Sequence, residues 1–122
     1  MKEVRSKSAP SPIGPYSQGI EAGAVYCSGQ IGLNSQTGNL ETGVVAQTAQ
    51  ALSNLEAVLA AAGLSMRNVV KTTVFLADIA EFSQMNDEYA KHFTPPFPAR
   101  STVQAGALPR GARVEIDAVA LR

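Results

Sequence analysis

The stretch VVAQTAQALSNLEAVLAAAG, residues 44–63, followed by NVVKTTVFLA, residues 68–77, sets the pattern of this chain. In the first part, small and apolar residues recur at three- and four-residue steps, which predicts a helix over 44–62. Gly63 is well placed as the left-handed residue that ends this helix. The second part is rich in β-branched and aromatic residues and predicts a strand. A leucine- and alanine-rich helix that leads into such a strand should lie flat on a sheet.

The rest of the chain extends this pattern. Residues 2–8 are polar and extended, and residues 9–15 hold three prolines and a glycine, so they form a shaped loop rather than a helix. Further elements are expected as strands over 16–20, 24–32, 100–105 and 113–121, and as a helix over 80–93. The order β-β-α-β-α-β-β predicts an α+β fold, a sheet covered on one face by two helices. The opposite face of that sheet then needs another cover.

Two local signals refine these elements. Gly29 lies inside the expected strand 24–32 and indicates a bulge or the close approach of a ligand. Asp78, with Glu81 three residues later, resembles a helix-start signal. In the last strand Glu115 and Asp117 share one face, and that face suits a site or a subunit interface.

Composition limits the class of protein. The 122 residues fit a single domain, and 10 Lys and Arg balance 10 Asp and Glu, which argues against nucleic acid as the main partner. No apolar run reaches the length of a membrane span, and the N-terminus lacks the apolar core of a signal peptide, so we expect a cytoplasmic protein without a membrane partner. The lone Cys27 and the lone His92 belong to no metal-ligand spacing, and we expect no metal site.

Two charged residues near the C-terminus suggest chemistry. Arg100, in Phe97–Thr102, lies on one β-like segment, and Glu115, in Arg113–Asp117, lies on the next. An arginine fork binds a small carboxylate through two parallel hydrogen bonds, and a glutamate within reach could move the protons of an attacking water. This pair predicts a site that hydrolyses a small organic acid. Asp117 is the alternative to Glu115 as the acid–base group.

Five blocks of the sequence, in this order, resemble the Rid family, whose members are also called YjgF or L-PSP endoribonuclease-like proteins. The blocks are Ala9–Gln18, Ser28–Ile31, Val70–Phe75, Pro98–Ser101 and Val114–Ile116. The likeness spans essentially the whole chain, and it implies a single Rid/YjgF-like domain over residues 1–122.

The resemblance implies a fold and a reaction. The fold is chorismate-mutase-like, and three subunits form a homotrimer with a barrel-like core and active sites in the clefts between subunits. A trimer interface would cover the free sheet face. The best-known branch hydrolyses small 2-imino or enamine acids, 2-iminobutanoate and 2-iminopropanoate, to 2-keto acids and ammonia without a cofactor.

The resemblance also implies roles for particular residues. Arg100 matches the arginine that binds the substrate carboxylate, and Glu115 matches the acidic residue that handles the attacking water. Tyr16 and Ser28 match residues that line the site, and we expect Tyr16 to take part in catalysis. Gly29 matches a backbone amide near the substrate.

Two more positions complete the expected substrate-binding set. Asn86 falls where the family often has an asparagine at the edge of the site. Thr102 stands where the imine-hydrolysing branch usually has cysteine, which leaves the subgroup and the substrate range open. Cys27 does not replace that thiol and is expected to be buried.

Other functions and readings remain open. The chain could be an endoribonuclease or translation inhibitor, a non-catalytic trimer that binds 2-keto acids, or a deaminase for a different acid. His92 is expected at a helix end near the negative end of the dipole. Arg110 and Arg113 are expected to be solvated turn residues.

Overall fold

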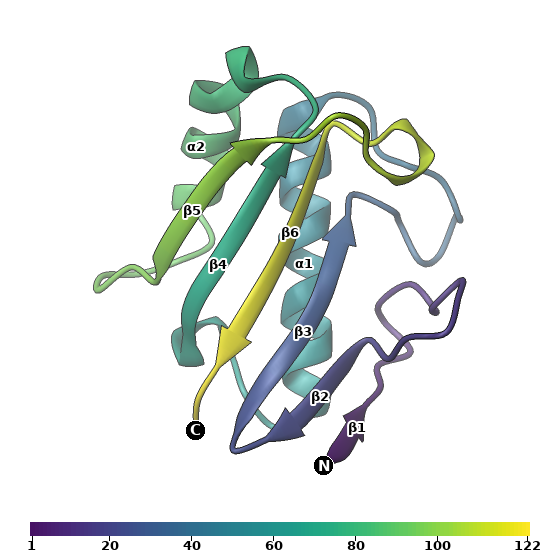
Figure 1. Ribbon diagram of the computed structural model, residues 1–122, viewed down its shortest axis with the longest axis vertical. Helices are drawn as coiled ribbons and strands as arrows, with labels where there is room; N and C mark the ends of the chain where they lie inside the picture. The colour runs from purple at the N-terminus through teal and green to yellow at the C-terminus, as the bar shows by residue number, and fades with distance from the viewer.

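The computed structural model describes residues 1–122 as one mixed α and β unit (Figure 1). The strands are β1 Lys2–Val4, β2 Gly19–Ala22, β3 Ala24–Ile31, β4 Val69–Leu76, β5 Ala99–Gln104 and β6 Val114–Ala120. The helices are α1 Val44–Ala61 and α2 Phe82–Ala90, and short 3₁₀ turns cover Met66–Asn68 (η1), Ile79–Glu81 (η2) and Pro109–Gly111 (η3). The expected elements are all present, and the N-terminal extended segment adds the strand β1.

The six strands form one sheet in the order β1-β2-β3-β6-β4-β5. Every pair is antiparallel except β4 with β5, which run parallel because α2 crosses between them. The last strand, β6, is therefore central, and β4 separates it from β5. At this end of the sheet β6 lies between β3 and β4, which are consecutive in the sequence.

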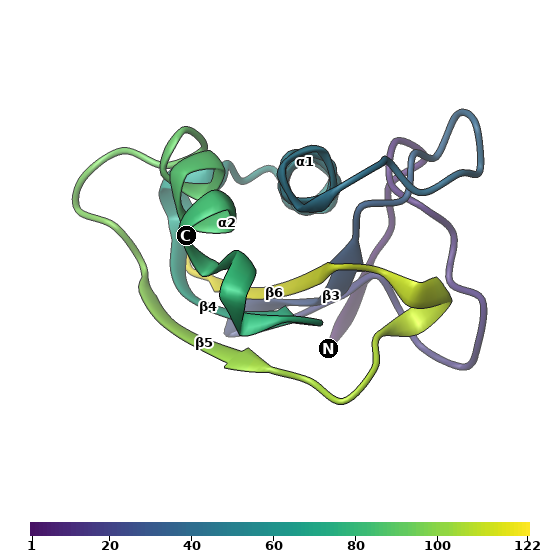
Figure 2. The ribbon, with the colours of Figure 1, turned by 90° about the horizontal axis from the view of Figure 1, so that it is seen from above.

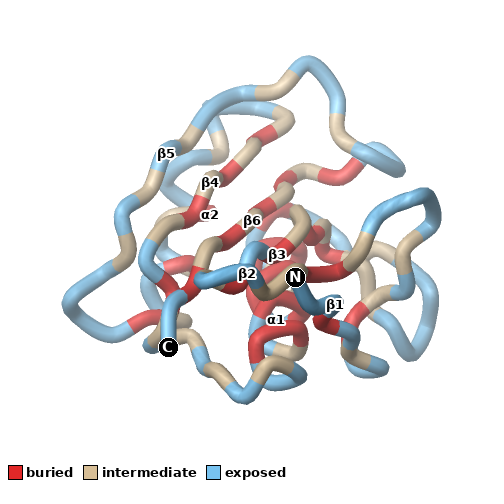
Figure 3. The backbone as a smooth tube through the Cα atoms, turned by 60° about the horizontal axis from the view of Figure 1, so that its bottom comes forward, coloured by how far each residue is buried: buried red, intermediate tan, exposed pale blue.

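Both helices lie on the same side of the sheet (Figure 2). The alternation of β6 explains this arrangement: Val114, Ile116, Ala118 and Ala120 are buried toward the helices, whereas the residues between them are half-buried on the other side. Figure 3 shows that buried residues concentrate along α1 and the central strands. The opposite sheet face carries no helix or other layer of this chain.

The core lies between α1 and the sheet. Its α1 members are Val44, Ala51, Leu52, Leu55, Val58 and Leu59, and the helix packs against β3, β6 and α2. The same helix face also buries three polar side chains, Gln47, Thr48 and Asn54. The face expected from the sequence to be leucine- and alanine-rich is thus partly polar, and two of these polar groups bond to loops around the candidate site.

Two local predictions are confirmed, and two elements have wrong boundaries, because the strand expected over residues 16–20 begins only at Gly19. Gly63 follows α1 with a φ of 75°, and the pairing of β3 with β6 shifts between Cys27 and Gln30, which is the bulge expected at Gly29. The second helix is shorter than predicted. Asp78 accepts a hydrogen bond from the N–H of Ala80 and begins a 3₁₀ turn, so α2 starts only at Phe82. No helix of the structure is long and apolar enough to cross a bilayer.

Candidate active site

A cavity of about 400 Å3 lies beside the bulge of β3. The proline-rich N-terminal loop, β3, the η3 turn and the start of β6 form its walls. Four of the residues singled out in the sequence line it together: Tyr16, Ser28, Gly29 and Glu115. The structure therefore brings the expected carboxylate and three of its expected neighbours into one place.

Glu115 and Gly29 are in direct contact. A Cβ added to Gly29 would overlap Oε2 of Glu115 and would lie 3.0 Å from its Cγ. The φ of Gly29 is outside the left-handed region, so the glycine is required here by space rather than by backbone conformation. The bulge of β3 thus makes room for the carboxylate of Glu115.

The carboxylate of Glu115 has no hydrogen-bond or ion-pair partner within the chain. Burial raises the pKa of Glu115 above the usual value for glutamate, and the nearby charge of Asp117 raises it further. An unpaired carboxylate with a raised pKa, facing a cavity, is a candidate acid–base group.

Asp117 has a different role from Glu115. Its Oδ1 accepts a hydrogen bond from the backbone N–H of Thr73 at 3.0 Å, which ties β6 to β4. Asp117 does not line the cavity. Of the two carboxylates that the sequence left open, Glu115 therefore lines the cavity and Asp117 does not.

The hydroxyl groups of Ser28 and Tyr16, which both line the cavity, form hydrogen bonds with the N-terminal loop. Ser28 donates through Oγ to the carbonyl of Ser17 at 2.6 Å, so its oxygen is left to accept a hydrogen bond from a ligand. The phenol oxygen of Tyr16 accepts a long hydrogen bond, 3.4 Å, from the N–H of Ile13, and its side chain is half exposed. The phenol O–H remains free to donate.

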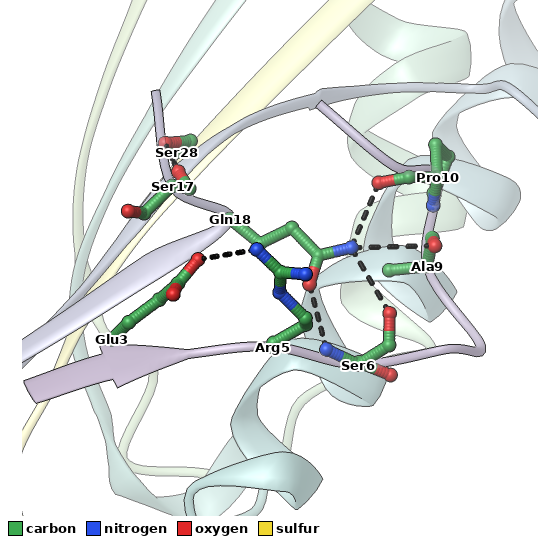
Figure 4. Close-up of polar contacts among 8 residues, drawn as sticks. All are labelled: Glu3, Arg5, Ser6, Ala9, Pro10, Ser17, Gln18 and Ser28. Carbon is green, nitrogen blue, oxygen red and sulfur yellow. Dashed lines mark hydrogen bonds and ion pairs between the residues drawn. The ribbon is translucent and has the colours of Figure 1, made fainter. Parts of the chain in front are cut away.

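The sequence analysis did not identify the residue that holds this loop in place, the buried Gln18. Its side chain accepts from the N–H of Ser6 and donates to the carbonyls of Ser6, Ala9 and Pro10, as Figure 4 shows. A loop without secondary structure thus satisfies its backbone groups through one amide. The signal available in the sequence was a glutamine in the middle of the strand expected over residues 16–20, where apolar residues would be usual.

Two further buried amides, both on α1, hold the other walls. Asn54 donates to the carbonyls of Ile31 and Leu33 at the end of β3, and both of these residues line the cavity. Gln47 donates to the carbonyl of Glu41 and accepts from the N–H of Arg113, just before β6. The polar residues on the buried face of α1 therefore position the backbone around the cavity.

Arg100 lies in a second hollow, against α2. Its Nη2 donates to Oδ1 of Asn86 at 2.8 Å, and its guanidinium carbon is 4.7 Å from the ring centre of Tyr89 and 5.5 Å from that of Phe82. Asn86 and Phe97 line the same hollow. Stacking and one hydrogen bond fix the orientation of the guanidinium and leave other N–H groups free for an anion.

Within one chain, Arg100 and Glu115 do not share a site. The sequence led us to expect these two residues within reach of one another on successive β segments, and this is wrong for a single chain, because β4 lies between β5 and β6. In the register, Arg100 pairs with the buried Thr72 and points to the helix side, whereas Glu115 is on the face without helices. The structure brings Arg100 together with Asn86, and Glu115 together with Tyr16, Ser28 and Gly29.

Thr102 lies two residues after Arg100 on the helix side of β5, where it pairs with Val74. Its Oγ1 is buried and has no hydrogen-bond partner. It lines neither of the two cavities. An unsatisfied buried hydroxyl is uncommon and marks a position where a donor or acceptor is available.

Other charged and reactive groups are placed as follows. Arg113 was expected to be solvated, but it forms a two-pronged ion pair with Glu81, at 2.9 and 2.7 Å, because the η2 turn packs beside the start of β6. Arg110 is exposed as expected, but it also lines the Glu115 cavity.

His92 pairs with Glu88 at 2.9 Å. Cys27 is buried, and burial raises the pKa of its thiol to about 11.

These features define an α+β domain with a candidate hydrolytic cavity, and known proteins share its fold. A family model described as Endoribonuclease L-PSP matches residues 6–122. The 2-iminobutanoate/2-iminopropanoate deaminase of Homo sapiens is 48% identical over 98% of this chain and 88% of the human protein. Protein DfrA of Myxococcus xanthus is also 48% identical, over 98% of this chain and 95% of that protein.

Solved structures give the same result. The crystal structure of YyfA from Yersinia pestis, a member of the Rid protein family, is 48% identical, with a TM-score of 0.94 over 99% of this chain and 98% of that one. The chain belongs to the Rid/YjgF family, whose model carries the L-PSP description. The resemblance inferred from the five sequence blocks is thus confirmed.

Proposed function

We propose that this protein is a hydrolytic deaminase of small 2-imino acids, which it converts to 2-keto acids and ammonia. The observation that carries the proposal is the unpaired carboxylate of Glu115, held over Gly29 in a cavity lined by Ser28 and Tyr16. The deaminase name of the human relative, at 48% identity, supports the same reaction. No specific observation favours the endoribonuclease that the family description names, or a binding role without catalysis.

The complete site, in this proposal, forms between copies of the chain. Arg100 and Glu115 lie on opposite faces of the sheet, so one chain offers a carboxylate-binding half and an acid–base half that do not meet. A second copy can bring its Arg100 hollow against the Glu115 cavity of the first. A head-to-tail contact of this kind closes into a ring, and the homotrimer with a barrel-like core and chorismate-mutase-like sheets is the ring we propose.

The free sheet face supports an assembly. It presents Phe75, Val103 and Val119 together with Thr73 and Ser101, a mixture of apolar and small polar side chains. Such a surface suits burial against other copies of itself. The trimer would thereby cover the face that the two helices leave open.

The reaction follows from the two halves. Arg100 of a neighbouring copy would hold the substrate carboxylate with parallel hydrogen bonds, and the protonated imine would face the carboxylate of Glu115. Glu115 takes a proton from water as the water oxygen bonds to the imine carbon, which gives a tetrahedral aminoalcohol. The same proton then passes to nitrogen, and the C–N bond breaks as the C=O double bond forms. The hydroxyl proton goes to Glu115, which passes it to the departing ammonia, so the products are the 2-keto acid and an ammonium ion.

The raised pKa of Glu115 suits this proton transfer. A carboxylate whose pKa lies closer to neutrality is a stronger base when ionised and a useful acid when protonated. Tyr16 would donate its phenol O–H, Ser28 would accept through Oγ, and the region of the Gly29 backbone would lie against the substrate. The reaction uses no cofactor in this scheme.

Asn86 and Thr102 belong to the arginine half. Asn86 fixes Arg100 through its Oδ1, and the unpartnered hydroxyl of Thr102 lies on the same side of β5 as Arg100. We assign both to substrate binding, with Thr102 in the place of the more usual cysteine. The reaction would take place in the cytoplasm, within one Rid-type domain spanning residues 1–122.

A subunit-mixing experiment tests the proposal. A threonine dehydratase generates 2-iminobutanoate, semicarbazide traps it, and loss of the semicarbazone signal reports hydrolysis by the added protein. We expect Arg100→Ala and Glu115→Gln to be inactive when each is refolded alone. When the two are denatured, mixed equally and refolded together, about a quarter of the wild-type activity should return, since one cleft in about four then receives both intact residues.

The outcomes separate the parts of the proposal. If wild-type protein does not reduce the semicarbazone signal, the deaminase assignment is wrong. If each variant is inactive and the mixture stays inactive although light scattering shows normal assembly, the shared cleft is wrong. Arg67→Ala is the matched control for Arg100→Ala, because Arg67 is exposed and its side chain has no partner.

A further inference from the structure

Arg110 lies beside the Glu115 cavity in an unusual backbone conformation. Its φ of 58° and ψ of 21° make it the one residue other than glycine with a positive φ in the chain. Glycine or asparagine adopts this conformation at lower cost. An arginine held there, at a cavity wall, points to a use for its side chain.

The guanidinium of Arg110 is mostly free. One N–H, on Nη1, donates to the carbonyl of Gly38 at 3.2 Å, and no ion pair is formed with Glu115 or any other acid. Arg110 and Glu115 are the two charged residues that line the cavity. The cavity therefore has an acid–base carboxylate and a separate, unpaired cation.

The cavity is also larger than the smallest substrates need. Its volume of about 400 Å3 lies within the range of pockets that hold drug-sized ligands, whereas a four-carbon imino acid has few heavy atoms. Once the imine faces Glu115 and the 2-carboxylate is on Arg100 of a neighbouring copy, the substrate side chain is the part left to contact the η3 turn. Apolar residues, Ile13 and Leu33 among them, and the cation of Arg110 border that space.

We propose that Arg110 is a specificity residue that binds the terminal carboxylate of 2-imino dicarboxylic acids of four or five carbons. The inference rests on the proposed deaminase function and names a further substrate class for the same cavity. Such imines form when amino acid oxidases act on acidic amino acids. Two arginines, one for each carboxylate, would then discriminate in favour of these substrates through charge-assisted hydrogen bonds.

The test compares two substrates in wild type, Arg110→Gln and Arg110→Lys. An L-aspartate oxidase supplies 2-iminosuccinate and the threonine dehydratase supplies 2-iminobutanoate, both followed by semicarbazide trapping. We expect the ratio of kcat/KM for the dicarboxylic substrate to that for the monocarboxylic one to fall about tenfold in Arg110→Gln. Arg110→Lys, which keeps the charge, should recover part of that ratio.

A structural role for Arg110 would give a different result. If the residue only holds the Gly38 turn through its hydrogen bond, both substrates lose activity together and the ratio stays constant, which overturns the proposal. A ratio that does not change because neither substrate is affected overturns it as well. Arg110→Gly removes the guanidinium without backbone strain and keeps the test valid if Arg110→Gln folds poorly.

A binding measurement makes the inference independent of turnover. Calorimetry with the products, 2-oxoglutarate against 2-oxobutanoate, should show a preference for the dicarboxylate in wild type that Arg110→Gln loses and the control Arg67→Gln keeps. Equal affinities of wild type for the two acids would refute the role of Arg110 even if the deaminase activity is established. Absence of deaminase activity with a preserved preference would refute the proposed function alone.

Discussion

The Glu115 cavity and the Arg100 hollow are held in place in different ways. The backbone positions the Glu115 carboxylate: a bulge in β3 opens a space for it, and the buried amides of Gln18, Gln47 and Asn54 fix the surrounding loops. Side chains position the Arg100 guanidinium on its edge strand, because two aromatic rings of α2 and Asn86 orient it. The acid–base half should therefore be sensitive to backbone changes, and the arginine half to side-chain changes.

The largest effect that separates the two regions is expected for Gly29→Ala. The new Cβ would occupy the position of the Glu115 carboxylate, so activity should fall about 100-fold or more, by analogy with the loss of one preorganised catalytic group. The fold should persist, because the end of a flexible side chain can move away. Imine hydrolysis and thermal melts of Gly29→Ala measure the two effects.

Gly106→Ala is the matched control for this change. A Cβ on Gly106 meets nothing within 4 Å, and its φ is not positive, so the substitution should alter neither activity nor stability. If Gly29→Ala acts by displacing Glu115, it should cost little further activity in a Glu115→Gln background. Additive losses in the double variant would show that Gly29 acts by some other route.

For the arginine half, Arg100→Lys should lower kcat/KM about 10- to 100-fold. Lysine keeps the charge but loses the planar fork, the contact with the Tyr89 ring at 4.7 Å and the hydrogen-bond geometry at Asn86. Steady-state kinetics with 2-iminobutanoate measure this loss, and Arg67→Lys at an exposed position serves as control. Wild-type kinetics in Arg100→Lys would mean that a point charge suffices and that the fork is not used.

The features of the two regions that the sequence could predict are those set by residues close together in the chain. The α1 helix, the β6 strand, the Gly63 cap and the Gly29 bulge follow from local periodicity and residue type, and all are present. The side of the sheet on which Arg100 lies depends on the placement of β4 between β5 and β6. That placement is a property of the whole sheet, which no local pattern encodes.

The buried polar residues were missed for a related reason. Gln18 bonds to residues 8 to 12 positions away, and Gln47 bonds to Arg113 at a separation of 66 residues. A glutamine in an amphipathic pattern looks like a surface residue until the loop that it satisfies is in place. The same holds for the Arg113–Glu81 ion pair, whose partners are 32 residues apart.

Because buried amides hold the loops around the Glu115 cavity, Gln18→Leu should mainly lower the stability of the protein and not change its catalytic groups. Leucine fits an apolar site but leaves the N–H of Ser6 and three carbonyls without partners, so the free energy of unfolding should fall by about 3 kcal/mol. Urea unfolding of Gln18→Leu measures it. Gln36→Leu is the control, since Gln36 is exposed and its side chain has no bond; equal stability of the two variants would show that the loop does not depend on Gln18.

The smallest expected effect is the change in the pKa of Glu115 when the charge of Asp117, the other carboxylate of β6, is removed. Burial and, secondly, Asp117 raise the pKa of Glu115, so the folded protein binds more protons than the unfolded chain between the two pKa values of this group. The free energy of unfolding should therefore fall as pH rises through that window, and Glu115→Gln should stabilise the protein above it but not below it.

In Asp117→Asn the amide oxygen can still accept from Thr73, while the loss of charge lowers the pKa of Glu115. The acid limb of the kcat/KM profile should then move to lower pH, though not to that of an ordinary glutamate, because burial remains. If the acid limb of Asp117→Asn lies at the same pH as that of wild type, a group other than Glu115 controls the reaction.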